Sequence, residues 1–133
     1  MVGRELGEDF PQRDSKIGEE ILRVENLSTE KTKLSNINFS LRKGEILGFA
    51  GLVGAGRTEV MRAIFGADPR TSGDIYIKGK KVEINKPIDA IEKGISLVPE
   101  DRKGQGVSLT MSIRENISLV CLKQICQAGR VNL

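Results

Sequence analysis

A run of apolar and small residues that leads straight into a glycine-rich loop constrains the fold more than any other stretch. Residues 46–52 read ILGFAGL, a continuous run that is typical of a parallel strand covered on both faces. The loop begins at Gly51, and residues 57–65 then place apolar side chains four apart before Gly66 stops the pattern, which predicts a short helix. Strand, glycine loop and helix in this order are the context of a phosphate-binding loop.

The loop almost matches the phosphate-loop motif G-x-x-x-x-G-K-[S/T]. Gly51 and Gly56 have the required spacing and Thr58 stands where a hydroxyl contacts magnesium, but Arg57 replaces the lysine. The helix macrodipole opposes a cation in the first turn by about 0.3 to 1 kcal/mol unless an anion sits there. We interpret the segment as a phosphate loop by descent; the alternative is that its glycines only make a tight turn. A dinucleotide fingerprint fails, because its third glycine would fall on Glu59.

Two side chains predict that this loop is a weakened phosphate cradle. The guanidinium of Arg57 is a larger planar fork than the compact ammonium of a lysine. Glu59 brings a carboxylate beside the expected phosphates, and two like charges about 4 Å apart cost on the order of 4 kcal/mol at an effective dielectric near 20.

The remaining pattern predicts strands and helices around this junction. Residues 1–20 are charged and broken by glycine and proline, which indicates a linker. Residues 21–28 and 37–46 alternate as half-buried strands do, and residues 73–84 form a hairpin around a Lys-Gly-Lys turn. Further along, we expect a helix over 87–94, a buried strand over 95–98, and a helix opened by a Ser112–Glu115 capping box that runs to about Cys121 or beyond.

Composition excludes several classes of function. The 21 basic residues are interleaved with 18 acidic ones for a net charge of +3, so nucleic acid is not an expected partner. No apolar run approaches the length of a membrane span and the polar start is no signal peptide, which favours the cytoplasm. With no histidine in the chain, no His-based triad or general base exists, and Cys121 and Cys126 are expected to be free.

Three stretches together carry a family resemblance: LRKGEILGFAGLVGAGRTEVMRAIFGADPRTSGDIYIKGK, GISLVPEDRKGQGV and MSIRENISL. They resemble the second nucleotide-binding domain of bacterial ABC importers for monosaccharides of the ribose and galactose type. The resemblance implies an α/β fold, a partial P-loop NTPase (ABC-type) core with an antiparallel β subdomain. Residues 1–20 are then an inter-domain linker, and residues 21–133 the N-terminal part of an ABC nucleotide-binding domain.

The resemblance also implies site residues. The phosphate loop of the family falls on Gly51, Gly54, Ala55, Gly56, Arg57 and Thr58, with Glu59 following. Thr58 is implied at the magnesium, and Glu100 stands where the family has a Q-loop glutamine that touches the metal; alternatively Glu100 is a solvated charge that closes a strand. The aromatic residue that stacks on adenine would fall in residues 28–33, where Lys31 or a neighbour stands instead.

The family's signature motif, Walker B strand and switch histidine would all lie beyond Leu133, so the fold is expected to be truncated before them. No catalytic residue is assigned, and we expect this chain not to hydrolyse ATP. The parallel strands that flank residues 46–52 in the family would also be missing. Each uncovered apolar side chain forfeits about 1.5 to 3 kcal/mol, which predicts self-association, strand exchange or rearranged packing.

The expected function is that of an ATP-binding component of an ABC transporter importing a monosaccharide. Its cofactors would be ATP and Mg²⁺, with binding weak or absent in this chain. Its partners would be permease membrane subunits, which residues 100–111 would approach, and another nucleotide-binding domain, at the cytoplasmic face of the membrane as a peripheral protein. The alternative is a non-catalytic regulatory or docking domain that does not use nucleotide. A stand-alone phosphotransferase or GTPase would need a downstream acidic strand or an N-K-x-D motif, and the sequence has neither.

Overall fold

The structure is a computed structural model that describes residues 16–31, 33–127 and 130–131. Most of the predicted linker, residues 1–15, lies outside the described residues. The chain divides into two compact units, one up to Ser96 and one from Leu97, and each is described by itself. Within the described residues, no helix has the length and apolar character that crossing a bilayer requires.

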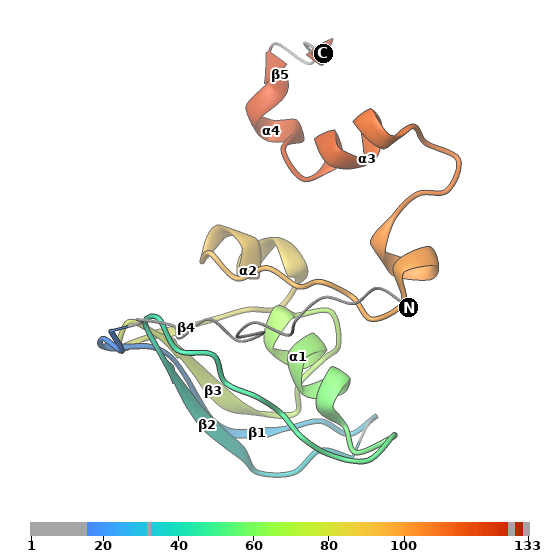
Figure 1. The fold of residues 1–133 in the computed structure, drawn as a ribbon. Helices are drawn as coiled ribbons and strands as arrows, with labels where there is room; N and C mark the ends of the chain where they lie inside the picture. The colour runs from blue at the N-terminus through green and yellow to red at the C-terminus, as the bar shows by residue number, and fades with distance from the viewer. Residues whose placement is uncertain (1–15, 32, 128–129, 132–133) are drawn as a thin grey trace, which may run out of the picture. The chain divides into compact units, whose positions relative to one another are not determined.

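The first unit is built on a four-stranded antiparallel sheet in the order β2-β1-β3-β4 (Figure 1). Its strands are β1 (Glu20–Ser28), β2 (Ile37–Arg42), β3 (Ser72–Ile77) and β4 (Lys80–Val82). The two alternating strands and the hairpin predicted from the sequence are therefore confirmed, although β2 ends before the turn at Lys43. Lys78 and Gly79 make the hairpin turn with φ of 49° and 74°, the left-handed pair that two-residue hairpins favour.

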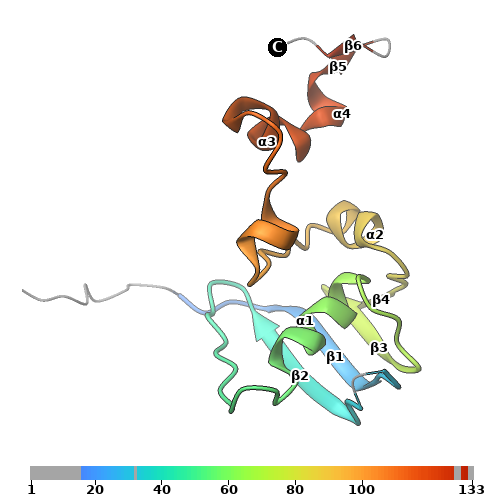
Figure 2. The same cartoon turned by 90° about the vertical axis from the view of Figure 1, so that its right-hand side faces the viewer.

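The inner face of the sheet carries the core. Phe39, Val24, Ile75 and Val82 lie side by side across the four strands, and Val24 and Ile75 are fully buried. Figure 2 shows α1 (Arg57–Phe65) lying across this face, where its buried residues join the same cluster. The helix predicted after the glycine loop is confirmed. It ends at Gly66, whose φ of 75° is the left-handed conformation typical of a helix C-cap.

The second helix, α2 (Pro87–Glu92), also confirms its prediction. Pro87 opens it at a first-turn position and Gly94 follows with φ of 83°. Ala90 is fully buried in the core cluster with Ile84, which precedes the helix. The segment from 84 to 94 therefore closes one side of the first unit's core.

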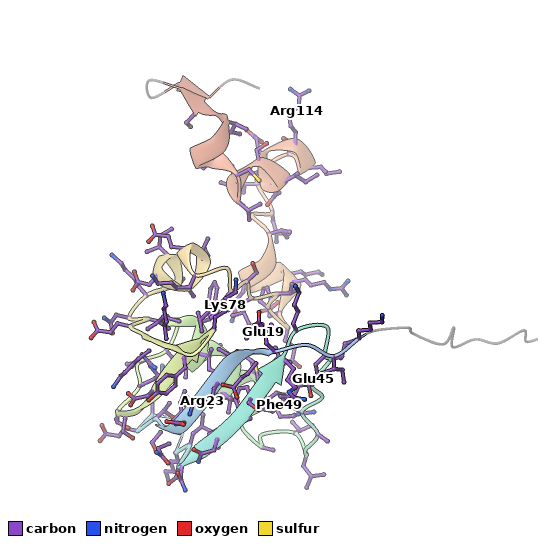
Figure 3. All side chains as sticks on the ribbon, turned by 90° about the vertical axis from the view of Figure 1, so that its left-hand side faces the viewer. Glu19, Arg23, Glu45, Phe49, Lys78 and Arg114 are labelled. Atoms are coloured by element: carbon purple, nitrogen blue, oxygen red, sulfur yellow. The ribbon has the colours of Figure 1, made fainter. Side chains whose placement is uncertain are left out.

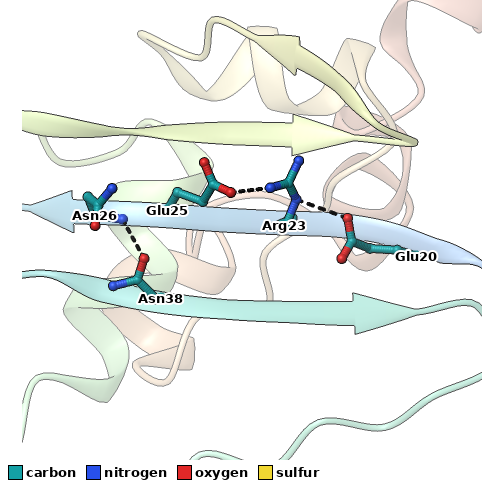
Figure 4. A network of polar contacts seen from close by, with 5 residues as sticks. All are labelled: Glu20, Arg23, Glu25, Asn26 and Asn38. Atoms are coloured by element: carbon teal, nitrogen blue, oxygen red, sulfur yellow. Dashed lines mark hydrogen bonds and ion pairs between the residues drawn. The ribbon is translucent and has the colours of Figure 1, made fainter.

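The opposite face of the sheet is polar. Figure 4 shows Arg23 on β1 between two carboxylates: its Nε lies 3.1 Å from Glu20 Oε1, and its Nη1 pairs with Glu25. The Arg23 guanidinium also lies 4.3 Å from the centre of the Tyr76 ring. Exposed pairs of this kind typically contribute less than about 1 kcal/mol, so this face contributes solubility more than stability.

The prediction of a buried strand at residues 46–52 is wrong for the described structure. This segment forms no strand with any described residue, and the Ile46 and Leu52 side chains are 75% and 85% exposed. Phe49, labelled in Figure 3, makes an edge-to-face contact with Phe39 on β2, at 5.0 Å between ring centres. A strand exists only where neighbouring strands pair with it, and no described strand lies beside this run.

The strand predicted at residues 95–98 is wrong for the same reason. Ile95 packs against the core of the first unit, but no ladder forms and Val98 is almost fully exposed. An apolar run alone therefore did not specify a strand at either place.

The second unit contains mostly short helical segments. They are η1 (Arg102–Gly106), a π-helical turn, then α3 (Ile113–Leu119) and α4 (Leu122–Ile125), followed by the two-residue strands β5 (Cys126–Gln127) and β6 (Arg130–Val131). The Ser112–Glu115 capping box is confirmed: Ser112 N–H donates to Glu115 Oε2 at 2.7 Å, and Glu115 N–H to Ser112 Oγ at 3.3 Å. The helix it opens ends at Leu119, earlier than predicted, and both cysteines are free.

Candidate functional site

The glycine loop precedes α1 and takes its shape from two left-handed glycines. Ala55 N–H donates to Leu52 O at 3.0 Å and closes a four-residue turn, in which Gly54 is the third residue with φ of 82°. Gly56 has φ of 87° and is the N-cap of α1, where its carbonyl accepts from Val60 N–H at 3.0 Å. A side chain at either position would strain the backbone, so both glycines are required by the path of the loop.

The N-terminal end of α1 offers backbone amide donors to a ligand. No side chain caps Gly56, and among the described residues no hydrogen bond is made by the N–H groups of Gly54, Gly56 or Arg57. These groups lie at the positive end of the helix macrodipole, in a loop whose residues from Gly51 to Ala55 are exposed. A phosphate fits these donors, because backbone N–H groups at a helix N-terminus are a common anion site.

Arg57 turns back toward the start of the loop. A Cβ added at Gly51 would lie 3.7 Å from Arg57 Cδ and 3.0 Å from Ala55 Cβ, so the Arg57 stem passes directly beside Gly51. Within the described part of the chain, no carboxylate forms an ion pair with Arg57. Arg57, the cation at the lysine position of the motif, therefore lies beside the glycine loop. The next residue, Thr58, is exposed.

Glu59 is half-buried and lies three residues before a second arginine, Arg62, on α1. Its charge helps to raise the pKa of Arg62, after the larger effect of the Asp68 hydrogen bond and charge. Arg62 binds Asp68 through two hydrogen bonds, Nε to Oδ2 at 2.7 Å and Nη2 to Oδ1 at 3.0 Å. The carboxylate of Glu59 is therefore not isolated, and its repulsion of bound phosphate stays a prediction.

Leu34 supports the loop from below, a contact that the sequence analysis missed. A Cβ added at Gly56 would lie only 2.6 Å from Leu34 Cδ2, so the helix N-cap rests directly on that side chain. Leu34 also packs against the core, and its carbonyl accepts from Thr29 N–H at 3.0 Å. The available signal was that Leu34 is the one apolar residue in the polar segment 29–36.

The predicted magnesium residues lie in different units. Thr58 follows the loop in the first unit, whereas Glu100 is an exposed residue of the second unit, so their pairing at a metal stays a prediction. Next to Glu100, Asp101 Oδ1 accepts from Lys103 N–H at 3.1 Å and Gly104 N–H at 2.9 Å and thereby shapes η1. No group of three His, Cys, Asp or Glu that could hold a metal ion occurs among the described residues. Mg²⁺ bound with a nucleotide needs no such group, because it takes most of its ligands from phosphates and water.

Lys31 stands in the segment where the family would supply an adenine-stacking aromatic. Its side chain is exposed, and its charge contributes to lowering the pKa of Asp68. The charge of Lys31 thus acts on Asp68 of the Arg62–Asp68 pair. In the segment where the family has an adenine-stacking aromatic ring, Lys31 provides a cation.

Comparison with known proteins extends these observations. A family model described as ABC transporter matches residues 34–131. The ribose import ATP-binding protein RbsA of Geobacillus kaustophilus is 55% identical over 129 residues, which are 97% of this chain and 26% of that protein. The RbsA of Caldanaerobacter subterraneus is 54% identical over 133 residues, 99% of this chain and 27% of that protein.

A third relative, the ribose import ATP-binding protein RbsA 3 of Rubrobacter xylanophilus, is 54% identical over 122 residues, 92% of this chain and 24% of that protein. The chain thus spans about a quarter of the length of the curated relatives that it matches. Its glycine loop, its α1 helix and its antiparallel sheet are parts of an ABC-type P-loop fold. On the family match and on these identities, the chain belongs to the ABC transporter family.

Proposed function

We propose that this chain supplies the phosphate-binding part of an ATP-binding domain in an importer of a monosaccharide. One observation carries the proposal most directly. The left-handed glycines Gly54 and Gly56 bring unengaged N–H groups to the start of α1, with Arg57 folded back beside them. Backbone donors at a helix N-terminus are the part of a phosphate loop that does not depend on the lysine.

The proposed roles follow from position. The N–H groups of Gly54, Gly56 and Arg57 would surround the phosphates, while Gly51 gives the Arg57 stem room to pass. The Arg57 guanidinium would reach the outer phosphates, and the Thr58 hydroxyl would contact Mg²⁺. We further propose Glu100 as a second metal contact and Glu59 as the residue that weakens binding. No residue of this chain is proposed to activate water.

For the whole protein, we propose partners and a substrate on the basis of its relatives. The similar proteins are named for ribose import, so we propose a ribose-like sugar as the cargo of the full transporter. The chain would work with permease subunits and a second nucleotide-binding domain at the cytoplasmic face of the membrane. A further partner is a second copy of the chain, because large apolar side chains such as Val53 are exposed.

A docking domain that does not use nucleotide is the second candidate. The observation in its favour is the loop tip, where Leu52 is 85% and Val53 99% exposed beside the substituted motif residues Arg57 and Glu59. Exposed apolar side chains at a loop tip suit a protein contact better than a nucleotide's phosphates. The two candidates differ in whether the loop has measurable affinity for Mg-ATP.

Calorimetric titration with Mg-ATP tests the proposal. We expect the Arg57→Lys/Glu59→Thr variant to bind Mg-ATP at least about tenfold more tightly than the unmodified chain does. A tenfold gain requires about 1.4 kcal/mol, and removing the repulsion between the Glu59 carboxylate and the phosphates is worth more than that. Glu83→Thr is the matched control, since it removes the same charge from an exposed site outside the loop. Binding that improves equally in the control would indicate only a change in net charge. No binding by any of the three would favour the docking domain.

A further inference from the structure

A polar cavity lies in the first unit, apart from the glycine loop. Its volume is about 280 Å³, and it is lined by the turn from Asp68 to Gly73, which connects α1 to β3, together with Ile84 and Asn85. This volume is at the lower end of the range for ligand pockets, which suits a single small group.

Arg70 is the cation of this cavity, and it is incompletely paired. Its side chain is half-buried, and one of its five N–H donors is used, Nη2 donating to Ile84 O at 2.9 Å. Burial lowers the pKa of Arg70, and the charge of Asp74 only partly opposes this effect. Within the described residues no carboxylate lies at ion-pair distance from Arg70, and Asp74, whose charge acts on Arg70, forms its ion pair with Lys81 at 2.8 Å.

Asp68 lines the same cavity and would repel an anion if it were free. Both of its oxygens are held by Arg62, at 2.7 and 3.0 Å, so this pair adds no net charge. The unbalanced charge at the cavity is therefore that of Arg70. A partly desolvated cation of this kind is stabilised by an anionic partner more strongly than by water alone.

Two neutral donors line the cavity beside Arg70. Thr71 is fixed by its N–H, which donates to Ser28 O at 2.9 Å, and Asn85 by its N–H, which donates to Asp89 Oδ2 at 3.0 Å. For the part of the chain that is described, neither the Thr71 hydroxyl nor the Asn85 side-chain amide has a hydrogen-bond partner. A planar guanidinium with a hydroxyl and an amide is a donor set that matches carboxylate and phosphate oxygens.

We propose that this cavity binds a small oxyanion, a phosphate or carboxylate group, through Arg70, Thr71 and Asn85. The site is distinct from the loop before α1 and does not depend on nucleotide binding there. Its ligand is the anionic group of a small molecule, because a volume of about 280 Å³ is at the lower end of the range for ligand pockets.

Nuclear magnetic resonance of the ¹⁵N-labelled chain tests this site directly. Inorganic phosphate and acetate are titrated separately at constant ionic strength, with chloride as the reference salt. We expect a saturable shift of the Arg70 Nε–H and of the Thr71 and Asn85 amides. Saturation with phosphate alone assigns a phosphate ligand, and saturation with acetate alone a carboxylate; either result supports the proposal.

Matched variants separate this site from other anion sites. Arg70→Lys keeps the charge but loses the planar fork and should weaken binding about tenfold, while Thr71→Val, which leaves the Ile84 contact intact, should weaken it a few-fold. Arg114→Gln, an exposed arginine of the second unit (Figure 3), should leave the affinity unchanged. Shifts that are confined to residues 51–58, that never saturate, or that persist unchanged in both Arg70→Lys and Thr71→Val would overturn the proposal.

Discussion

Two separate constraints favour glycine at position 56, where the glycine loop joins α1, whereas only one of them applies at Gly54. Both glycines have left-handed φ angles, 87° and 82°, but an added Cβ would collide with Leu34 at Gly56 and meet nothing within 4 Å at Gly54. We expect Gly54→Ala to lower the free energy of unfolding by about 1 kcal/mol from backbone strain. Gly56→Ala should cost roughly 1 to 3 kcal/mol more, because overpacking is added.

Urea unfolding of the two variants measures this difference. Shortening the colliding side chain in the double variant Leu34→Ala/Gly56→Ala should recover part of the extra loss, relative to the sum of the two single variants. Equal losses in Gly54→Ala and Gly56→Ala would show that Leu34 does not support the loop.

Asp68 makes stability depend on pH through its bond to Arg62. The Arg62 hydrogen bond is the main cause that holds the pKa of Asp68 below its usual value, and the Arg62 and Lys31 charges add to it. Because the folded pKa is the lower one, this contribution is complete above the ordinary pKa near 4 and is lost as pH falls through the folded value. Asp68→Asn should therefore cost about 1 kcal/mol at neutral pH, and the difference from the unmodified chain should shrink in acid.

Thermal unfolding at several pH values checks this expectation. Asp101→Asn is a useful comparison, because among the described residues that carboxylate accepts from backbone N–H groups of η1 and from no arginine. A loss from Asp68→Asn that stays constant down to strongly acidic pH would contradict an ionic origin.

The N-terminal end of α3 is held by a side chain from inside the helix as well as by its capping box. Asn116 Oδ1 accepts from Ser108 N–H at 2.8 Å, and the two N–H groups of its Nδ2 are shared among the carbonyls of Ser108, Met111 and Ser112, at 3.0 to 3.2 Å. Asn116→Ala should speed hydrogen exchange at the Ser108 amide by about tenfold or more, since several bonds of about 1 kcal/mol are lost together. Ser118→Ala, which removes only a bond to Arg114 O, should not change exchange at that amide.

The elements that the sequence predicted correctly are those set by near neighbours. The hairpin of β3 and β4 depends on a two-residue turn, α1 and α2 on local periodicity with glycine stops, and α3 on a cap three residues away. The runs 46–52 and 95–98 failed because a strand needs partners that periodicity cannot supply, and no described strand pairs with either.

The candidate site likewise has one part that the sequence predicted and another that it did not. The motif spacing predicted where glycines are needed, and Gly54 and Gly56 have the left-handed angles that only glycine adopts easily. The Leu34 contact under the loop and the Arg62–Asp68 pair were not predicted, because each contact arises from tertiary packing; for Leu34 the only sequence signal was its apolar side chain in a polar segment. The roles of Thr58, Glu59 and Glu100 toward a nucleotide remain predictions for the titration to test.

For the whole molecule, exposed apolar side chains favour association with a second copy. Ile46 and Val53 in the first unit, and Ile113 and Val120 in the second, are each at least three-quarters exposed. Exposed apolar surfaces of this kind mark contact sites or aggregation sites. We expect sedimentation velocity to find species heavier than 14.6 kDa whose share grows with concentration.

Charged substitutions in each unit locate the contact. Ile46→Lys/Val53→Lys alters the first unit, and Ile113→Lys/Val120→Lys makes a matched change in the second; both leave the buried core untouched. The pair that restores the 14.6 kDa species identifies the unit whose apolar residues are covered. A single 14.6 kDa species for the unmodified chain at all concentrations would contradict association and would leave these side chains available to a different partner.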